Sequence, residues 1–256
     1  FGTSVYKGLK AGIKILADIN VVLAIFAILF VLLAGPGVFI LDLTVNSFGL
    51  MFSNFMSTAT WTDPIREGDF PEAWTGFYWA WWFAYTGMVG LFFGRISRGR
   101  TIRQLVLGVI TWGCIGTWLF LAVMGGYSLF LEKTGALAIT EILNSQGMSF
   151  LNALVIKSLP FGKITLAIFT VLSIIFYATT IDSSAYVISS ICAKDLENTQ
   201  EPRRWNRITW AVLLALITAG LLQADSLQTT LSMTVVSSLP MIPILILLCI
   251  SIRKWL

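Results

Sequence analysis

The chain has 256 residues, of which 57% are hydrophobic and 12% are charged, with a mean hydropathy of +0.83. Ordinary soluble domains carry roughly 25% charged residues, so this composition places the chain in a lipid bilayer. The sequence contains no histidine and only three scattered cysteines, which excludes Ser-His nucleophile pairs, histidine metal sites and CxxC metal motifs within it.

The first predicted elements lie between residues 20 and 60. An apolar run from Asn20 to Ile40 has the length of roughly 20 residues that a helix needs to cross a bilayer, and Gly35-Pro36-Gly37 interrupts it near its end. The next segment, residues 44–60, carries apolar residues at helical spacing with Asn, Ser and Thr between them. This pattern predicts an amphipathic helix that lies in the membrane interface.

Five further apolar runs predict membrane-spanning helices, at residues 74–93, 105–124, 164–192, 208–222 and 231–252. A tight basic turn at residues 95–103 joins the first two of them. After Gly125-Gly126, a long loop with a short amphipathic helix at residues 136–143 is expected. The sequence therefore predicts an all-α integral membrane protein with six transmembrane helices and one interfacial amphipathic helix.

The distribution of basic residues predicts the orientation of these helices. If the basic stretch at residues 7–14 is cytoplasmic, six crossings place loops 95–103 and 194–207 on the cytoplasmic side together with Arg253 and Lys254. Of the 17 Lys and Arg residues, 13 then lie inside, as the positive-inside rule requires. The net charge of +4 follows from membrane topology, and no nucleic-acid binding is expected.

The run at residues 74–93 has an unusual aromatic face. At about 100° per residue, five rings fall within roughly 100° of arc; they belong to Trp74, Tyr78, Trp81, Trp82 and Tyr85. Interfacial belts explain Trp and Tyr at headgroup depth, but the last three rings lie deeper than a belt requires. Aromatic faces attract quaternary ammonium groups, which cannot donate hydrogen bonds. Residue chemistry alone leaves a cation cage and simple packing equally open.

The run at residues 164–192 contains the polar residues Thr179, Thr180 and Asp182, which should face protein or water because unsatisfied polar groups are costly in lipid. Both threonine hydroxyls could simply bond back to a carbonyl of the preceding turn. We expect Asp182 to be a buried polar anchor rather than an ion ligand. The arginines of the 95–103 turn could set topology alone, latch a cytoplasmic gate or bind anionic lipid.

The segment Phe77-Tyr78-Trp79-Ala80-Trp81-Trp82, followed by Arg95-Ile-Ser-Arg-Gly-Arg-Thr-Ile-Arg103, resembles the signature of the betaine/choline/carnitine transporter family. The resemblance extends over essentially the whole chain. It implies part of a LeuT-type fold of twelve helices with inverted repeats, of which this chain would be helices seven to twelve. Residues 1–73 then hold the last helix of the first repeat and the interfacial connecting helix. Residues 74–256 hold the second repeat with five transmembrane helices, and the N-terminal half lies outside this sequence.

The resemblance also implies a substrate site. Trp81, Trp82 and Tyr85 match the family positions that cage a trimethylammonium group, and Phe77 and Trp79 line the same pathway. Family members often continue this motif with Trp-Ser-Pro, whereas this chain has Tyr85-Thr86-Gly87. The choice among glycine betaine, choline and carnitine therefore stays open.

In sodium-coupled relatives, the positions of Thr179 and Thr180 bind Na⁺ together with a backbone oxygen near Phe176. The resemblance thus implies a secondary active transporter with alternating access, Na⁺-coupled symport and no other metal, cofactor or catalytic residue. It further implies a homotrimer in the cell (inner) membrane. The alternatives are a sodium-independent exchanger of the carnitine/butyrobetaine type and a membrane osmosensor that does not transport.

Overall fold

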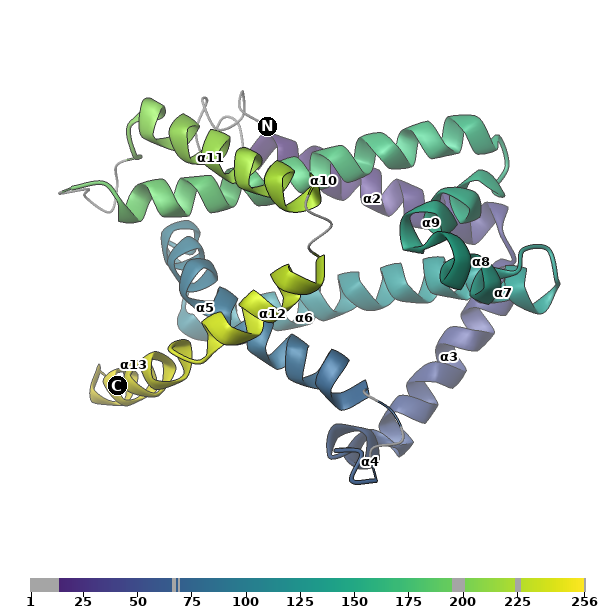
Figure 1. Cartoon of the computed structure of the whole chain (residues 1–256), viewed down its shortest axis with the longest axis horizontal. Coiled ribbons are helices and arrows are strands. Elements are labelled where there is room, and N and C mark those ends of the chain that lie inside the picture. The colour runs from purple at the N-terminus through teal and green to yellow at the C-terminus, as the bar shows by residue number, and fades with distance from the viewer. Residues whose placement is uncertain (1–13, 66–67, 69, 195–200, 224–226, 256) are drawn as a thin grey trace. The chain divides into compact units, whose positions relative to one another are not determined.

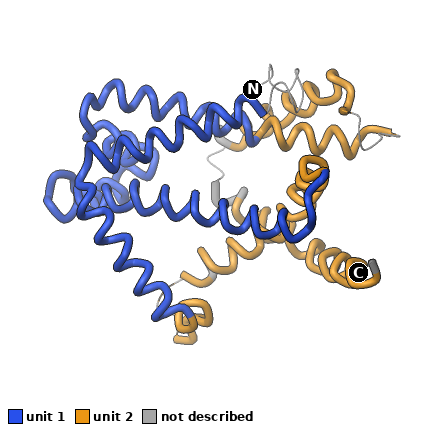
Figure 2. Tube along the Cα trace, turned by 180° about the vertical axis from the view of Figure 1, so that it is seen from behind, with its two compact units in different colours: residues 1, 10–55, 99–180 blue, residues 2–9, 56–98, 181–256 orange. Residues whose placement is uncertain are grey.

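The computed structural model describes residues 14–65, 68, 70–194, 201–223 and 227–255. Within these ranges the chain forms helices and turns with no β-strand, so the predicted all-α class is confirmed. The described chain divides into two compact units, coloured separately in Figure 2. Unit 1 comprises residues 14–55 and 99–180, and unit 2 comprises residues 56–98 and 181–255.

Unit 1 combines long helical segments with several short helices (Figure 1). Its elements are α2 (Lys14–Ala34), α3 (Gly37–Ser53), α6 (Ile102–Phe120), the π-helical turn η3 (Leu121–Gly125), α7 (Gly126–Lys133), α8 (Ile139–Gln146), α9 (Met148–Lys157) and most of α10 (Gly162–Ile191). Unit 2 contains the π-helical turn η2 (Pro71–Gly76), α5 (Phe77–Ile96), the end of α10, α11 (Arg204–Gln223), α12 (Leu227–Ser238) and α13 (Met241–Trp255). The short helix α4 (Phe55–Ala59) lies at the boundary.

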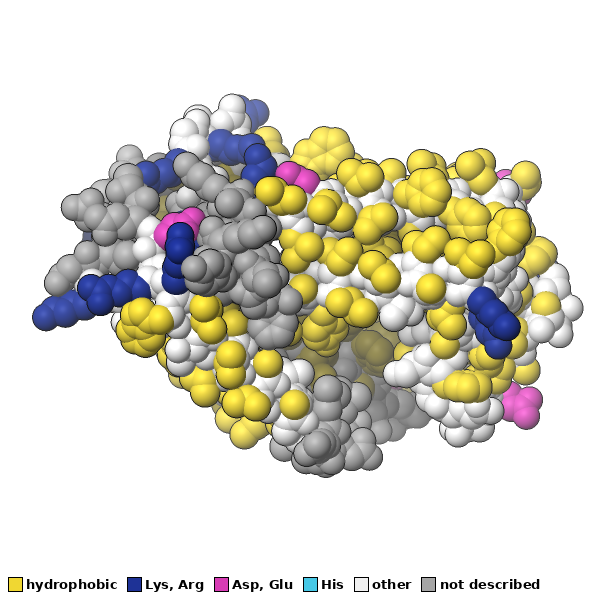
Figure 3. Space-filling view, turned by 90° about the horizontal axis from the view of Figure 1, so that it is seen from above, with side chains coloured by type: hydrophobic (Ala, Val, Ile, Leu, Met, Phe, Trp, Pro, Cys, Tyr) yellow, Lys and Arg dark blue, Asp and Glu magenta, His cyan; other side chains and the backbone are white. Residues whose placement is uncertain are grey.

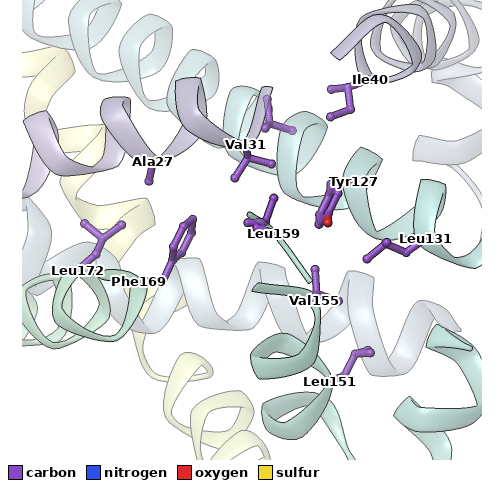
Figure 4. Close-up of a cluster of buried hydrophobic side chains, with 11 residues drawn as sticks. Ala27, Val31, Ile40, Tyr127, Leu131, Leu151, Val155, Leu159, Phe169 and Leu172 are labelled. Carbon is purple, nitrogen blue, oxygen red and sulfur yellow. The ribbon is translucent and has the colours of Figure 1, made fainter. Parts of the chain in front are cut away.

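The core of unit 1 is a cluster of buried apolar side chains from α2, α3, α7, α9 and α10, shown in Figure 4. Val31 of α2 lies at its centre with no exposed surface. The core also holds one polar link, because the Tyr127 hydroxyl lies 2.9 Å from the Ser158 hydroxyl. Gly126 lets α7 approach α3 closely, since a Cβ there would lie 3.4 Å from Cγ1 of Ile40.

The first predicted span ends earlier than the sequence indicated. The prediction of residues 20–40 was wrong at its far end, because α2 ends at Ala34 and α3 begins at Gly37. Pro36 lacks an amide hydrogen and disfavours helical geometry at the residue before it. A Cβ at Gly35 would lie 2.6 Å from the Val31 carbonyl oxygen, so this turn has no room for a side chain. The predicted amphipathic helix at 44–60 corresponds to α3 and α4.

The third predicted span continues past its expected end. Gly125 and Gly126 do not end the helix, because η3 widens into a π-helical turn there and α7 runs on to Lys133. The loop predicted after the glycines is mostly helical, with α8 and α9 in place of one short helix at 136–143. The glycine pair therefore marks a close helix contact rather than a chain break.

Three described helical segments are long and apolar enough to cross a membrane: Lys14–Ala34, Ile102–Lys133 and Gly162–Ile191. The pair Leu231–Ser238 and Met241–Lys254, bent by 44°, qualifies as a fourth if it is one span. The helices α5 and α11 have 20 residues each and are long enough to cross a membrane. They are not among these segments, because the Trp and Tyr rings of α5 and the first-turn arginines of α11 lower their mean hydropathy. Exposed hydrophobic side chains occupy much of the described part of the face seen in Figure 3, as a lipid-embedded protein requires.

In unit 2, α5 packs along α12. The side of α5 opposite the aromatic face carries the small residues Ala80, Ala84 and Gly87, and Gly76 of η2 precedes them. Ala80 is buried, and a Cβ at Gly87 would lie 3.3 Å from the Met241 methyl group of α13. Small residues permit close approach of helices in membranes. Ala80 on this side is therefore buried, whereas Trp81 and Trp82 of the aromatic face are exposed.

Candidate functional site

The aromatic side chains of α5 are largely accessible in unit 2. Trp82 is 59% exposed, Trp81 is 43% exposed, and Phe77 and Tyr85 are half-buried. The rings form one aromatic face because the 3.6-residue period of α5 places residues four apart above one another.

Trp81 lies at the centre of the ring contacts on this face. Its indole stacks with Phe77 at a centroid distance of 6.4 Å and contacts Trp82 at 5.9 Å and Tyr85 at 6.4 Å. It also contacts Tyr78 at 5.9 Å. The structure thus brings four of the five residues proposed for the substrate site into one ring cluster. These spacings match those at which aromatic rings stabilise one another.

Trp79, the fifth proposed residue, lies outside this cluster. It contacts Phe83 at 5.9 Å on the flank of the helix and is 63% exposed. Trp79 and Trp82 nevertheless share a groove, which connects the flank with the aromatic face.

The groove is an open hollow of about 700 Å³ at the N-terminal end of α5. Six residues line it: Phe70, Trp74, Thr75, Tyr78, Trp79 and Trp82. None carries a charge, and the polar groups are one threonine hydroxyl, one phenol and the indole N–H groups. Trp74 stacks on Tyr78 at 6.1 Å, and Phe70 lies 6.4 Å from Trp74. The lining supplies ring faces for a cation and a few hydrogen-bond donors for an anionic group.

Sequence reasoning missed Phe70 and Thr75 as groove residues. Phe70 lies four residues before Trp74, so the aromatic i, i+4 series begins there, but Pro71 signals a helix start and hides the continuity. The turn Pro71–Gly76 is π-helical and joins α5 directly. π-Helical turns are frequent at functional sites, and they carry no sequence pattern of their own.

In α10, the three residues proposed for an ion site bring three oxygen atoms together. The Thr179 hydroxyl donates to the Phe176 carbonyl oxygen at 2.7 Å, and the Thr180 hydroxyl donates to the same oxygen at 3.2 Å. Each hydroxyl oxygen keeps lone pairs, so the arrangement can coordinate a hard cation. One helix supplies only part of a coordination shell. The same hydrogen bonds also satisfy the hydroxyls without any ion.

Asp182 lies two residues beyond Thr180 on α10, and its side chain is fully buried.

The basic segment predicted as a turn at residues 95–103 turns at residues 97–101, between α5 and α6, with Gly99 at φ +79°. Thr101 caps α6 through a reciprocal pair of hydrogen bonds with Gln104. Among the described residues, no three His, Cys, Asp or Glu side chains converge as metal ligands. The part of loop 194–207 at residues 195–200 lies outside the described residues.

Ring faces can hold a solute and hydroxyl oxygens can hold an ion by non-covalent contacts. Here both kinds of group are carried by helices of a multi-pass membrane protein. This is the chemistry of a membrane transporter. The model of the BCCT family, described as betaine/carnitine/choline family transporter, matches residues 1–256, and the chain belongs to this family.

Three relatives are named as transporters of carnitine, glycine betaine and choline. The chain is 33% identical over 257 residues to a carnitine transporter of Acinetobacter baumannii, covering 100% of this chain and 47% of the relative. It is 32% identical over 261 residues to a glycine betaine transporter of Acinetobacter baylyi, covering 98% and 37%. It is 34% identical over 239 residues to a high-affinity choline transport protein of Escherichia coli, covering 93% and 35%. The chain therefore spans half or less of the length of these relatives.

Proposed function

We propose that the chain is part of a secondary active transporter for quaternary-ammonium solutes, namely glycine betaine, choline or carnitine. The observation that carries the proposal is the uncharged aromatic face of α5. A quaternary ammonium group cannot donate a hydrogen bond, and its positive charge is attracted to the faces of Trp and Tyr rings. The names of the relatives support the same class of solute.

The trimethylammonium group binds against Trp81, Trp82 and Tyr85 in this proposal, and Phe77 and Trp79 line the path to it. Trp81 contacts Phe77, Trp82 and Tyr85, which holds these rings in place before the solute arrives. The Tyr78 and Thr75 hydroxyls in the adjoining groove can donate to the carboxylate of betaine or carnitine. Choline has no carboxylate and would use neither donor in this way.

Transport is proposed to be coupled to Na⁺ at Thr179, Thr180 and the Phe176 carbonyl. Their convergent oxygens support this assignment. Sodium-independent exchange is the second candidate, because the hydroxyls are already satisfied by the carbonyl without an ion. A membrane osmosensor that does not transport is the third, and uptake itself separates it from the other two.

The proposed location of the protein is the inner membrane. The positive-inside rule places loops 95–103 and 194–207 in the cytoplasm. Alternating access proceeds by movement of one helical repeat against the other, and the transporter assembles as a homotrimer. Residues 1–73 and 74–256 are taken as the end of the first repeat and as the second repeat.

Uptake by the full-length transporter tests this function. Cells that lack other transporters of these solutes should accumulate at least one radiolabelled solute among glycine betaine, choline and carnitine when they express the protein. The matched control is the Trp81→Leu, Trp82→Leu variant at equal membrane abundance. Accumulation of none of the three solutes by the wild type would refute the proposal.

A further inference from the structure

The last turn of α5 ends in a cation that reaches a ring of α10. The guanidinium carbon of Arg95 lies 5.9 Å from the centroid of the Tyr186 ring. A guanidinium within about 6 Å of a ring centroid makes a cation–π contact. Arg95 also lies at the C-terminal end of α5, where a positive charge is favoured by the helix dipole.

Tyr186 is a fixed partner for this contact. Its side chain is only 3% exposed, and its carbonyl oxygen accepts hydrogen bonds from the Ser189 hydroxyl at 2.9 Å and the Ser190 hydroxyl at 2.8 Å. The Asn206 side chain of α11 donates to the Ser189 carbonyl oxygen at 3.0 Å. The Asn206 bond joins this end of α10 to α11, and the two serine bonds lie within α10 itself. Arg95, on a long flexible stem, is the partner that can move.

The two helices joined by this contact carry the two parts of the proposed transport machinery. The aromatic face lies on α5, and Arg95 follows Tyr85 by about 15 Å at 1.5 Å per residue. The proposed ion oxygens lie on α10, where Tyr186 follows Thr180 by about 9 Å. The contact is therefore separate from both sites, and it touches neither the solute nor the ion.

We propose that Arg95 and Tyr186 form a positioning pair that holds the cytoplasmic end of α5 to α10 while solute is bound, and that separates when solute is released. The inference rests on the proposed function. Arg suits this task because its planar guanidinium stays charged and stacks on ring faces, whereas Lys is a compact and strongly hydrated charge. A cation–π contact is weak enough to break and re-form in each transport cycle.

Spin labels can follow the pair directly in the full-length transporter. One label is attached to Cys192, just after α10, and one to Arg98→Cys, just after α5; both positions are exposed, and the other cysteines are replaced by serine. Double electron–electron resonance with saturating solute should give one narrow distance distribution in the parent protein. Arg95→Gln and Tyr186→Leu should broaden it toward longer distances, whereas Tyr186→Phe, which keeps the ring, and Arg100→Gln, which removes a neighbouring charge, should not.

Uptake by the same variants, without labels, tests the positioning role. We expect Arg95→Gln to lower the maximal uptake rate about fivefold, in line with the strength of one cation–π contact. The solute Kd from tryptophan fluorescence should stay within about twofold, and Arg95→Lys should restore part of the rate. The Arg95→Gln, Tyr186→Leu double variant should be no slower than the slower single variant.

Unchanged distance distributions in Arg95→Gln and Tyr186→Leu would overturn the proposal. So would additive losses of rate, or a loss of solute binding that parallels the loss of uptake. If the wild type takes up none of the three solutes, the proposed function fails. The distance measurement, repeated without solute and with Tyr186→Phe as its control, still tests whether Arg95 and Tyr186 hold the two helices together.

Discussion

The indole of Trp81 stacks on the ring of Phe77 one turn earlier in α5, with centroids 6.4 Å apart and ring planes 11° apart. Tyr85, one turn later, contacts the same indole at 6.4 Å. Trp81 therefore has ring neighbours on both sides along the helix. Such packing orders the indole before a solute binds, which lowers the entropy lost on binding.

Removing the Phe77 ring should therefore weaken solute binding through Trp81. We expect Phe77→Leu to raise the KM for uptake about three- to fivefold, because stacking of an aromatic pair contributes about 0.5–1.5 kcal/mol. The maximal rate should change little. Phe92→Leu, at the other end of α5, is the matched control and should leave the KM unchanged. An equal change in both variants would show that Phe77 acts only through general packing.

Trp82 should matter more than Phe77, since it belongs both to the ring cluster and to the groove. Trp82→Leu should reduce solute affinity about tenfold or more, because a desolvated cation–π contact contributes about 2 kcal/mol. The protein should still insert, as membrane abundance will show. Trp112→Leu provides the control on α6, where the indole is 74% exposed. Wild-type affinity in Trp82→Leu would remove this residue from the cage.

Hydropathy and helical periodicity were sufficient to predict the all-α class and the aromatic face of α5. The breaks between helices were harder to predict. At Gly35-Pro36 the apolar run conceals a helix end, whereas at Gly125-Gly126 the glycines suggested an end that does not occur. A helical glycine costs only about 1 kcal/mol, and the close approach of Gly126 to Ile40 gives tertiary packing that offsets this cost. Local sequence does not reveal such a contact.

In the candidate sites too, contacts within one helix could be predicted from the sequence, and contacts between helices could not. Contacts between residues four apart, such as Phe77 with Trp81, are fixed by the helix itself and can be read from spacing. The contact between Arg95 and Tyr186 joins residues far apart in the chain and has no local signal. Back-bonding of the Thr179 and Thr180 hydroxyls was one of the alternatives that the sequence left open, whereas their convergence on one carbonyl was not predicted. An ion role for these oxygens is still a prediction.

Sodium coupling can be tested at Thr179. Thr179→Ala removes one of the three convergent oxygens, so it should raise the Na⁺ concentration for half-maximal uptake about tenfold or more, the loss expected for one contact to a charged group. Thr179→Ser retains the oxygen and should behave like the wild type. Thr209→Ala removes a hydroxyl that also bonds back to its own helix, at the Trp205 carbonyl, and serves as the control. Equal wild-type uptake in Na⁺ and K⁺ buffers would favour sodium-independent exchange.

The core of unit 1 offers a test that does not depend on transport. Tyr127 is buried, and its hydroxyl lies 2.9 Å from that of Ser158, which in turn donates to the Val155 carbonyl at 2.7 Å. Tyr127→Phe keeps the ring in the core but removes this bond, so it should lower the free energy of unfolding by about 0.5–1.5 kcal/mol. A thermal unfolding curve of the purified full-length transporter in detergent would show this as a lower Tm. Tyr177→Phe, at a residue of α10 that is 65% exposed, should leave the Tm unchanged. If both variants unfold at the wild-type temperature, the Tyr127–Ser158 bond contributes nothing measurable, and apolar packing around Val31 alone stabilises this part of the fold.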